Sequence, residues 1–148
     1  MTWALFAAGL ATFAELYTTQ PLLPLLSTHF GVAPGSAALS VSVTTLTLGI
    51  ALLFVGPMSE VVGRTKVMMI SLFGASVMAV ACAAAPTWGS LLVLRGLLGF
   101  AVAGLPAVAV AYLREEVAPS AMARATGQYI GGTALGGMSG RLVAGALA

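Results

Sequence analysis

The chain has 148 residues, of which 59% are hydrophobic and 7% are charged, with a mean hydropathy of +1.05 and a net charge of +2. Soluble domains carry about 25% charged residues, so this composition excludes an ordinary soluble domain and indicates that lipid surrounds most of the chain. The sequence has no basic patch for binding nucleic acid, and its lone Cys82 excludes an internal disulfide.

Five apolar segments are long enough to cross a bilayer, which takes roughly 20 residues in a helix. We expect transmembrane helices over 3–26, 37–55, 67–85, 90–113 and 122–148, joined by short loops. The first segment lacks a positively charged start and is too long for a signal peptide, so we expect it to be retained. The chain begins and ends close to a span and shows no second domain boundary. These features predict an all-α membrane protein that is one partial domain of a longer chain.

The first span carries an acid near its middle. Thr12, Glu15 and Thr19 fall at helical spacing on one face and form a polar stripe. Pro21 and Pro24 are expected to break the regular hydrogen bonding near the far end of this span.

The second span carries a similar stripe, made by Ser40, Thr44 and Thr47. Hydrogen bonds between helices are the favoured interpretation of these hydroxyls, and contact with a substrate is the alternative. A short charged turn, 56–66, is expected to follow this span.

The fourth and fifth spans contain small residues beside arginines. Arg95 and Gly99 share one face of the fourth span, and Arg141 lies toward the end of the fifth. Small residues at intervals of four let helix backbones approach closely. The fifth span is therefore expected to pack through its glycines, which are Gly127, Gly132, Gly136, Gly140 and Gly145.

The basic residues of the loops predict the orientation. Arg64 and Lys66 lie between the second and third spans, and Arg114 and Arg124 flank the loop between the fourth and fifth, whereas the other two loops have no Lys or Arg. Loops rich in Lys and Arg stay in the cytoplasm. We therefore expect a cytoplasmic N-terminus and an external C-terminus.

Ionisable residues within spans are candidates for function. A charge at the bilayer centre costs about 2.5–3.5 kcal/mol on insertion scales, so such residues usually face a protein interior or a wet cavity. Glu15, Arg95 and Arg141 are of this kind. Two alternatives remain open: either arginine can extend to the membrane surface, and Glu15 can be a neutral structural acid and not a proton carrier.

The residues needed for an enzyme or a metal centre are lacking. The sequence has one His, one Cys and no Asp, so neither a metal cluster nor a Ser-His-Asp set can form. The paired glycines of the fifth span lie inside an apolar segment and do not follow a strand, unlike a nucleotide-binding loop. We therefore expect no enzymatic activity and neither a metal nor an organic cofactor.

The segment 56–66 resembles the motif G-x-L-a-D-r-x-G-r-k, which joins the second and third spans of proteins in the major facilitator superfamily. Gly56, Gly63 and Arg64 match this motif. Glu60 stands in place of the Asp, and Lys66 supplies a positive charge one position later.

Other spans resemble further motifs of the same family. The fourth span is similar to l-x-x-R-x-x-q-G through Arg95 and Gly99, and Glu15 and Pro24 have the spacing found in drug/proton antiporters. The fifth span resembles the antiporter motif G-x8-G-x3-G-P-x2-G-G, with Arg141 where Pro is expected. The glycines that match are Gly127, Gly136, Gly140 and Gly145.

This resemblance implies twelve spans in two six-helix halves, with this chain supplying the first five spans of the N-terminal half. It implies a location in the bacterial inner membrane, and its expected partners are the lipid bilayer, a small-molecule substrate and the missing C-terminal half. The resemblance also implies that Arg95 is involved in proton coupling and that Glu60 contacts the opposite half of the protein. The loop residues expected to control gating are Gly56, Glu60, Gly63, Arg64 and Lys66.

We therefore expect proton-coupled export of a small amphipathic or sugar-like solute by alternating access. Glu15 is expected to carry the proton, with Arg95 tuning it electrostatically. Uptake by proton symport and a non-transporting membrane fragment or scaffold remain alternatives. The residues expected to line the cavity or contact the substrate are Thr12, Thr19, Ser40, Thr44, Thr47, Gly99 and Arg141.

Overall fold

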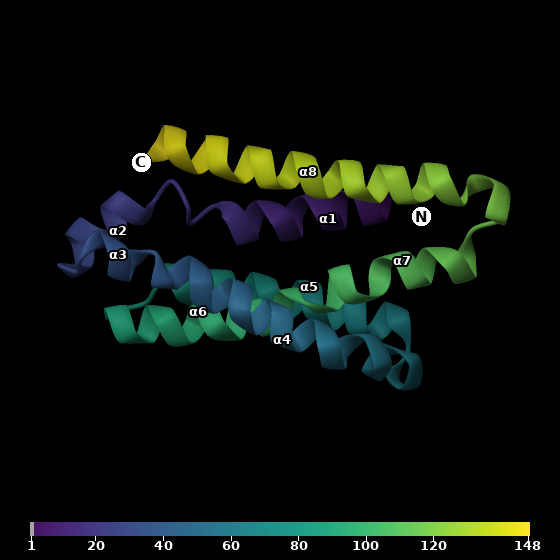
Figure 1. Ribbon diagram of the computed structural model, residues 1–148, viewed down its shortest axis with the longest axis horizontal. Helices are drawn as coiled ribbons and strands as arrows, with labels where there is room; N and C mark the ends of the chain where they lie inside the picture. The colour runs from purple at the N-terminus through teal and green to yellow at the C-terminus, as the bar shows by residue number, and fades with distance from the viewer. Residues whose placement is uncertain (1) are drawn as a thin grey trace.

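The computed structural model describes residues 2–148, and within this range it contains helices and no strand. The prediction of an all-α fold is thereby confirmed. The helices form an elongated bundle (Figure 1). They are α1 (Thr2–Tyr17), α2 (Leu23–Phe30), α3 (Pro34–Ala37), α4 (Leu39–Val62), α5 (Arg64–Ala83), α6 (Trp88–Val102), α7 (Gly104–Glu116), the short 3-10 helix η1 (Pro119–Ala121) and α8 (Met122–Leu147).

Three helical stretches are long and apolar enough to cross a membrane, namely Pro34–Val62, Arg64–Ala83 and Trp88–Glu116. Large apolar side chains cover their outer faces; Leu53 is 72% exposed and Phe73 is 73% exposed. Lipid tails are the favourable surroundings for such side chains. Helices α1 and α8 are not among these three stretches; α1 has only 16 residues, and α8 is rich in glycine. The two helices lie beside one another along the bundle.

The first predicted span, 3–26, is not one continuous helix. Helix α1 ends at Tyr17, and residues 18–22 form turns before α2 begins at Leu23. Pro21 has no backbone N–H to donate and Pro24 occupies the first turn of α2, so the chain bends here. The segment after this span, which we expected to be a loop over 27–36, contains the rest of α2 and the start of α3.

The charged segment 56–66 is mostly helical, contrary to the prediction of a turn. Helix α4 continues to Val62 in spite of Pro57, and α5 begins at Arg64. Only Gly63 departs from helical geometry, with φ of 102° and ψ of 128°. A side chain is strained at this backbone conformation, so one glycine is sufficient to reverse the chain.

The fourth predicted span is also interrupted. Helix α6 ends at Val102 and α7 begins at Gly104, because Pro106 has no N–H to offer the carbonyl of Val102. The Ser71 hydroxyl of α5 donates to the Ala101 carbonyl oxygen across a distance of 2.5 Å. This contact fixes the interruption against the neighbouring helix.

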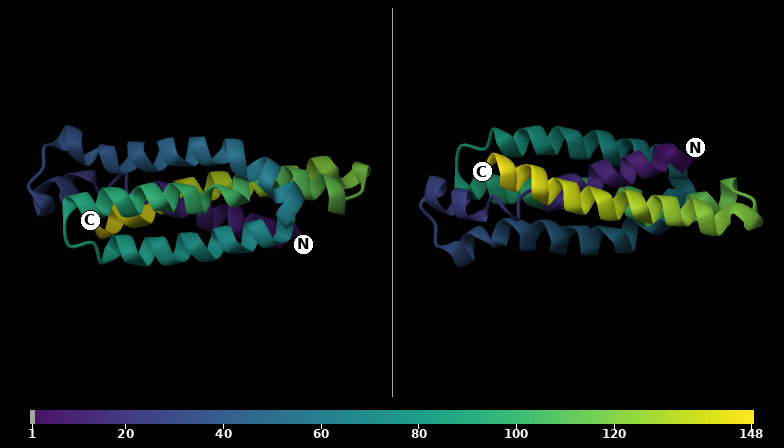
Figure 2. Two further views of the ribbon diagram at one scale, coloured as in Figure 1. Left: turned by 90° about the horizontal axis from the view of Figure 1, so that it is seen from below. Right: turned by 90° about the horizontal axis from the view of Figure 1, so that it is seen from above.

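The connections gather at the two ends of the bundle. The connections from α4 to α5 and from α7 to α8 lie at the same end as the N-terminus, and the loops that precede α3 and α6 lie at the other end with the C-terminus (Figures 1 and 2). The basic loops therefore share one end, as membrane orientation by positive charge requires.

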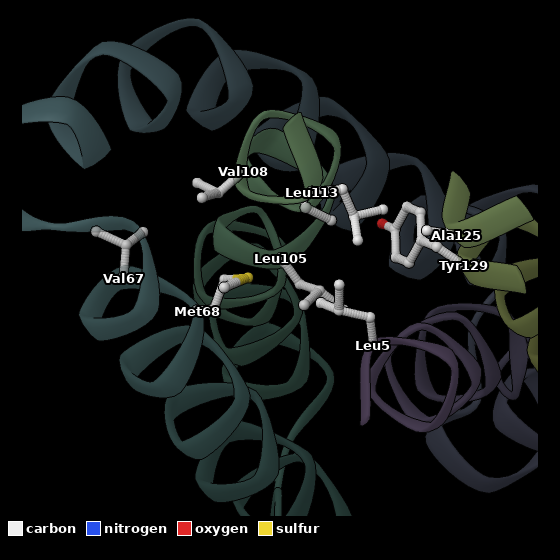
Figure 3. Packing of buried hydrophobic residues seen from close by; sticks show 9 residues of the cluster. Leu5, Val67, Met68, Leu105, Val108, Leu113, Ala125 and Tyr129 are labelled. Atoms are coloured by element: carbon white, nitrogen blue, oxygen red, sulfur yellow. The ribbon is translucent and has the colours of Figure 1, made fainter. Parts of the chain in front are cut away.

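The largest apolar core surrounds α7 (Figure 3). Leu105, Val108 and Leu113 of α7 are fully buried there. They pack with Leu5 of α1 and Tyr129 of α8 in the same cluster. The helix after the interruption thus joins the α1–α8 pair to the rest of the bundle.

Candidate binding cavity between α1, α2, α5 and α6

A cavity of about 610 Å³ lies at the end of the bundle where α2 folds back. Its volume falls within the range of about 300–1,000 Å³ that is usual for small-molecule sites. Most of its wall is apolar. Its polar side chains are Glu15, Thr18, Thr19, His29, Cys82 and Arg95, contributed by α1, the turn after it, α2, α5 and α6.

Arg95 is the most deeply buried ionisable side chain of this cavity, with only 4% of its surface exposed. Its Nε donates a hydrogen bond to the main-chain carbonyl oxygen of Ser40 in α4, 3.2 Å away. Its Nη2 is buried and has no partner among the described residues. The guanidinium is therefore anchored on one side, and on the other its terminal Nη2 is buried without a partner in residues 2–148.

Gly99 explains why α4 lies within reach of Arg95. A Cβ atom at Gly99 would overlap Thr47 Oγ1 and the Thr44 carbonyl oxygen, so only glycine allows the two backbones to come this close. Gly99 itself does not line the cavity. In the structure it permits helix packing, and its predicted contact with a substrate stays a prediction.

Glu15 lines the same cavity from α1, and its Oε1 is buried without a partner in the described part of the chain. No ion pair within 4.0 Å joins it to Arg95 in residues 2–148. Two unpartnered groups of opposite charge thus border one largely apolar space. Such groups are costly to keep from water unless they find partners, which makes this cavity the candidate site of the described residues.

The hydroxyl stripe of α4 does not act as predicted. The Thr44 hydroxyl donates to the Ser40 carbonyl oxygen at 2.9 Å, and the Thr47 hydroxyl donates to the Val43 carbonyl oxygen at 3.0 Å. Ser40 likewise donates within its own chain segment, to the Ala37 carbonyl oxygen at 2.7 Å. These hydroxyls donate to carbonyl oxygens three or four residues earlier in the chain, as Ser and Thr commonly do in helices, and do not form hydrogen bonds between helices. Ser40, Thr44 and Thr47 do not line the cavity.

On the first span, the predicted stripe is divided. Thr19 lines the cavity, whereas Thr12 is buried with 2% exposure and lies outside it. Helix α1 ends between these two positions and the chain turns, so helical spacing did not predict that only Thr19 would line the cavity.

Arg141 lies away from the cavity, at the exposed far end of α8. Its Nε donates to the Gln20 side-chain oxygen at 2.7 Å, and its guanidinium carbon lies 4.1 Å from the centre of the Tyr17 ring. It therefore links the end of α1 to α8 and does not line this cavity, while its predicted contact with a substrate stays a prediction.

Three glycines of α8 face three residues of α1 at matching intervals. A Cβ at Gly132, Gly136 or Gly140 would overlap a carbonyl oxygen of α1, those of Phe6, Leu10 and Ala14 in turn. Close backbone contact is therefore the basis of the α1–α8 pair. Gly127 faces open space, and a Cβ at Gly145 would make an ordinary 3.5 Å contact with Pro21. These two do not take part in the predicted packing.

The residues of the charged segment lie at the opposite end of the bundle from the cavity. Arg64 at the start of α5 pairs with Glu115 near the end of α7, with 2.7 Å between Nη2 and Oε1. Glu60 and Lys66 are exposed. A Cβ at Gly56 would meet nothing within 4 Å.

Sequence reasoning did not identify His29, Phe30 and Cys82 as part of the cavity wall. Phe30 also packs against Trp88 at the start of α6, with ring centres 5.7 Å apart. The two prolines near the end of the first span were the available signal, because a chain that turns back there brings the following residues over the cavity.

The Major Facilitator Superfamily model matches residues 5–148 of the chain. The chain is 46% identical over 145 residues to "Inner membrane transport protein YnfM" of Escherichia coli (strain K12), covering 98% of this chain and 35% of that protein. It is 48% identical over 147 residues to "Uncharacterized MFS-type transporter YybF" of Bacillus subtilis (strain 168), covering 99% of this chain and 36% of that protein. The chain thus spans about a third of the length of these relatives.

Proposed function

The chain belongs to the major facilitator superfamily, and we propose that its native-length protein exports a small amphipathic solute across a bacterial inner membrane in exchange for protons. The observation that carries this proposal is the cavity bordered by Glu15 and Arg95. The proposed orientation has a cytoplasmic N-terminus, which the positive charges at one end of the bundle support.

In this mechanism Glu15 alternates between a carboxylate and a protonated acid. The carboxylate balances the positive charge of Arg95 across the apolar cavity. When Glu15 takes a proton, Arg95 is left as an uncompensated charge in a poorly solvated place, which raises the free energy of that arrangement. The protein relieves this cost by changing conformation, so the protonation state of one acid selects the side to which the cavity opens.

Exchange, rather than symport, follows if solute and proton compete for Glu15. A solute that donates a hydrogen bond to the carboxylate favours the ionised acid and expels the proton. The resemblance of α8 to the antiporter motif supports the same direction. Its glycines at 132, 136 and 140 contact α1, the helix that carries Glu15, so a shift of α8 would move the helix that holds this acid.

The test uses everted membrane vesicles that contain the native-length protein and are energised to an acidic interior, with acridine orange as the reporter of the pH gradient. The solutes added outside share a phenylalkyl body and are phenylbutyramide, phenylbutyrate and phenylpropyl-trimethylammonium. We expect at least one of them to dissipate the gradient, because solute entering the vesicle by exchange carries protons out. The same solute should have no effect on vesicles containing Glu15→Gln.

A symporter would give a different result, since dissipation would then need solute loaded inside the vesicles. Thr45→Ala is the matched control, because Thr45 is exposed on α4 and only donates to the Val41 carbonyl oxygen. Dissipation that persists in Glu15→Gln would overturn the assignment of the proton to this acid.

A further inference from the structure

The charged groups of the cavity balance one another. Among the lining residues, Glu15 and Arg95 are the acid and the base, and the remaining titratable side chains are His29 of α2 and Cys82 of α5. The other described acids and bases lie outside the lining. When Glu15 is ionised, its negative charge balances the positive charge of Arg95.

The two charged groups offer complementary hydrogen bonding. Arg95 Nη2 is a donor without an acceptor, and Glu15 Oε1 is an acceptor without a donor. The bond from Arg95 Nε to the Ser40 carbonyl oxygen restrains the guanidinium plane. A ligand group placed between the two side chains must therefore accept from one and donate to the other.

Apart from the hydroxyls of Thr18 and Thr19, the rest of the wall is apolar. Leu22, Leu26, Leu91 and Leu98 line it, and Phe30 closes the part near Trp88. An apolar body of moderate size fits such a wall, whereas a second charged group would meet no partner there.

We propose that the substrate is a neutral amphipathic molecule whose polar head carries adjacent hydrogen-bond donor and acceptor groups, such as a primary amide or a vicinal diol. The donor binds the Glu15 carboxylate and the acceptor binds the Arg95 guanidinium, while the apolar body packs on the leucines. This assignment rests on the proposed function, because it names the substrate class of the same cavity.

Charged ligands are disfavoured by the same balance. An anion would gain from Arg95 and be repelled by the ionised Glu15, and a cation would face the opposite arrangement. Either would leave one buried charge without compensation in a medium of low dielectric constant. A neutral head leaves the pair balanced.

Cys82 provides a reporter inside the cavity that does not depend on transport. It is the only cysteine of this chain and lines the same space. The experiment measures the rate at which N-ethylmaleimide alkylates Cys82 in the native-length protein, with any cysteine outside this chain replaced by serine. Phenylbutyramide, phenylbutyrate and phenylpropyl-trimethylammonium are the ligands, since they share an apolar body and differ in head charge.

We expect phenylbutyramide to slow alkylation at a concentration about tenfold lower than either charged ligand, since a tenfold ratio corresponds to about 1.4 kcal/mol and a hydrogen bond to a charged group contributes at least that much. Replacing each charged residue in turn should shift the preference in opposite directions. Glu15→Gln leaves Arg95 uncompensated and should make phenylbutyrate the best protector. Arg95→Gln leaves Glu15 uncompensated and should favour phenylpropyl-trimethylammonium.

Arg95→Lys keeps the charge and should keep the preference for the amide, which guards against loss of folding in Arg95→Gln. Equal protection by all three ligands, or best protection by a charged ligand in the unmodified protein, overturns the proposal. If the expected protection pattern is found but no protons are exchanged, the proposed substrate class holds and the proposed export function is overturned. If protons are exchanged but a charged ligand protects best, the export function holds and the proposed substrate class is overturned.

Discussion

The guanidinium of Arg95 is held by the main chain of Ser40, whose carbonyl oxygen lies 3.2 Å from Arg95 Nε. The same oxygen accepts from the Thr44 hydroxyl at 2.9 Å. Because the acceptor belongs to the backbone, the position of Arg95 depends on how closely α4 and α6 approach and not on the identity of a side chain in α4.

Gly99→Ala should therefore disturb Arg95 although the two side chains do not interact. The added Cβ would overlap Thr47 Oγ1 and the Thr44 carbonyl oxygen. Overpacking of this kind costs about 1–3 kcal/mol. We expect a lower unfolding temperature in detergent together with weaker ligand protection of Cys82. Gly49→Ala is the control on α4, where a Cβ would meet nothing within 4 Å, and an equal loss in both variants would contradict this account.

Gly136→Ala should separate α8 from α1. Its Cβ would overlap the Leu10 carbonyl oxygen, and a backbone atom cannot move aside as a flexible side chain can. We expect a loss of about 1–3 kcal/mol in stability, measured as the unfolding temperature of the native-length protein. Gly131→Ala, one helix face away and with open space around it, should leave the unfolding temperature unchanged or raise it slightly. A stable Gly136→Ala would show that the glycine line does not hold the pair.

Gly63→Ala should be costly for a different reason. No atom lies within 4 Å of the added Cβ, yet φ of 102° is a conformation that side chains rarely adopt. Backbone strain of this type costs about 1–3 kcal/mol. Gly56→Ala, which belongs to α4 and also faces open space, should be tolerated. If the two substitutions lower the unfolding temperature equally, the turn does not require glycine.

Arg141→Ala should weaken the end of the α1–α8 pair without abolishing transport. The variant loses the bond to Gln20 and the contact with the Tyr17 ring, and exposed cation–π contacts contribute about 0.5–1 kcal/mol. A double-mutant cycle with Tyr17→Leu should show coupling in the unfolding temperature. Complete loss of transport at unchanged stability would instead indicate that Arg141 contacts the substrate.

The proposed orientation can be tested with cysteines introduced into a Cys82→Ser background. Thr65→Cys, next to the turn at Gly63, should react with a membrane-impermeant maleimide only after the cells are permeabilised. Thr87→Cys, at the opposite end of the bundle, should react in intact cells. The reverse pattern would place the N-terminus outside.

The helical fold could be predicted from the sequence because long apolar segments leave few alternatives in a bilayer. The glycines at 132, 136 and 140 could be predicted to pack for a similar reason, since their spacing brings them to one face. Hydrophobicity is averaged over many residues, so single departures from helical geometry do not disturb such predictions.

The lining of the cavity could not be predicted in the same way. It depends on the turn over 18–22, which brings His29 and Phe30 back over Glu15, and on a hydroxyl stripe that bonds within its own chain segment. A period of 3.6 residues identifies which residues share a face but not which neighbour that face meets. Arg141 and Gly99 illustrate the difference, because each lies on a suitable face and contacts another helix instead of the cavity.

In the proposed mechanism, Glu15 exchanges a proton for the solute. The most direct test measures proton release when ligand is added to the purified native-length protein in weakly buffered detergent solution over a range of pH. The ligand is the one of the three phenylalkyl solutes that best protects Cys82. The unmodified protein should release protons as the ligand binds, and Glu15→Gln should bind its preferred ligand without release. Equal proton release by both proteins would contradict the claim.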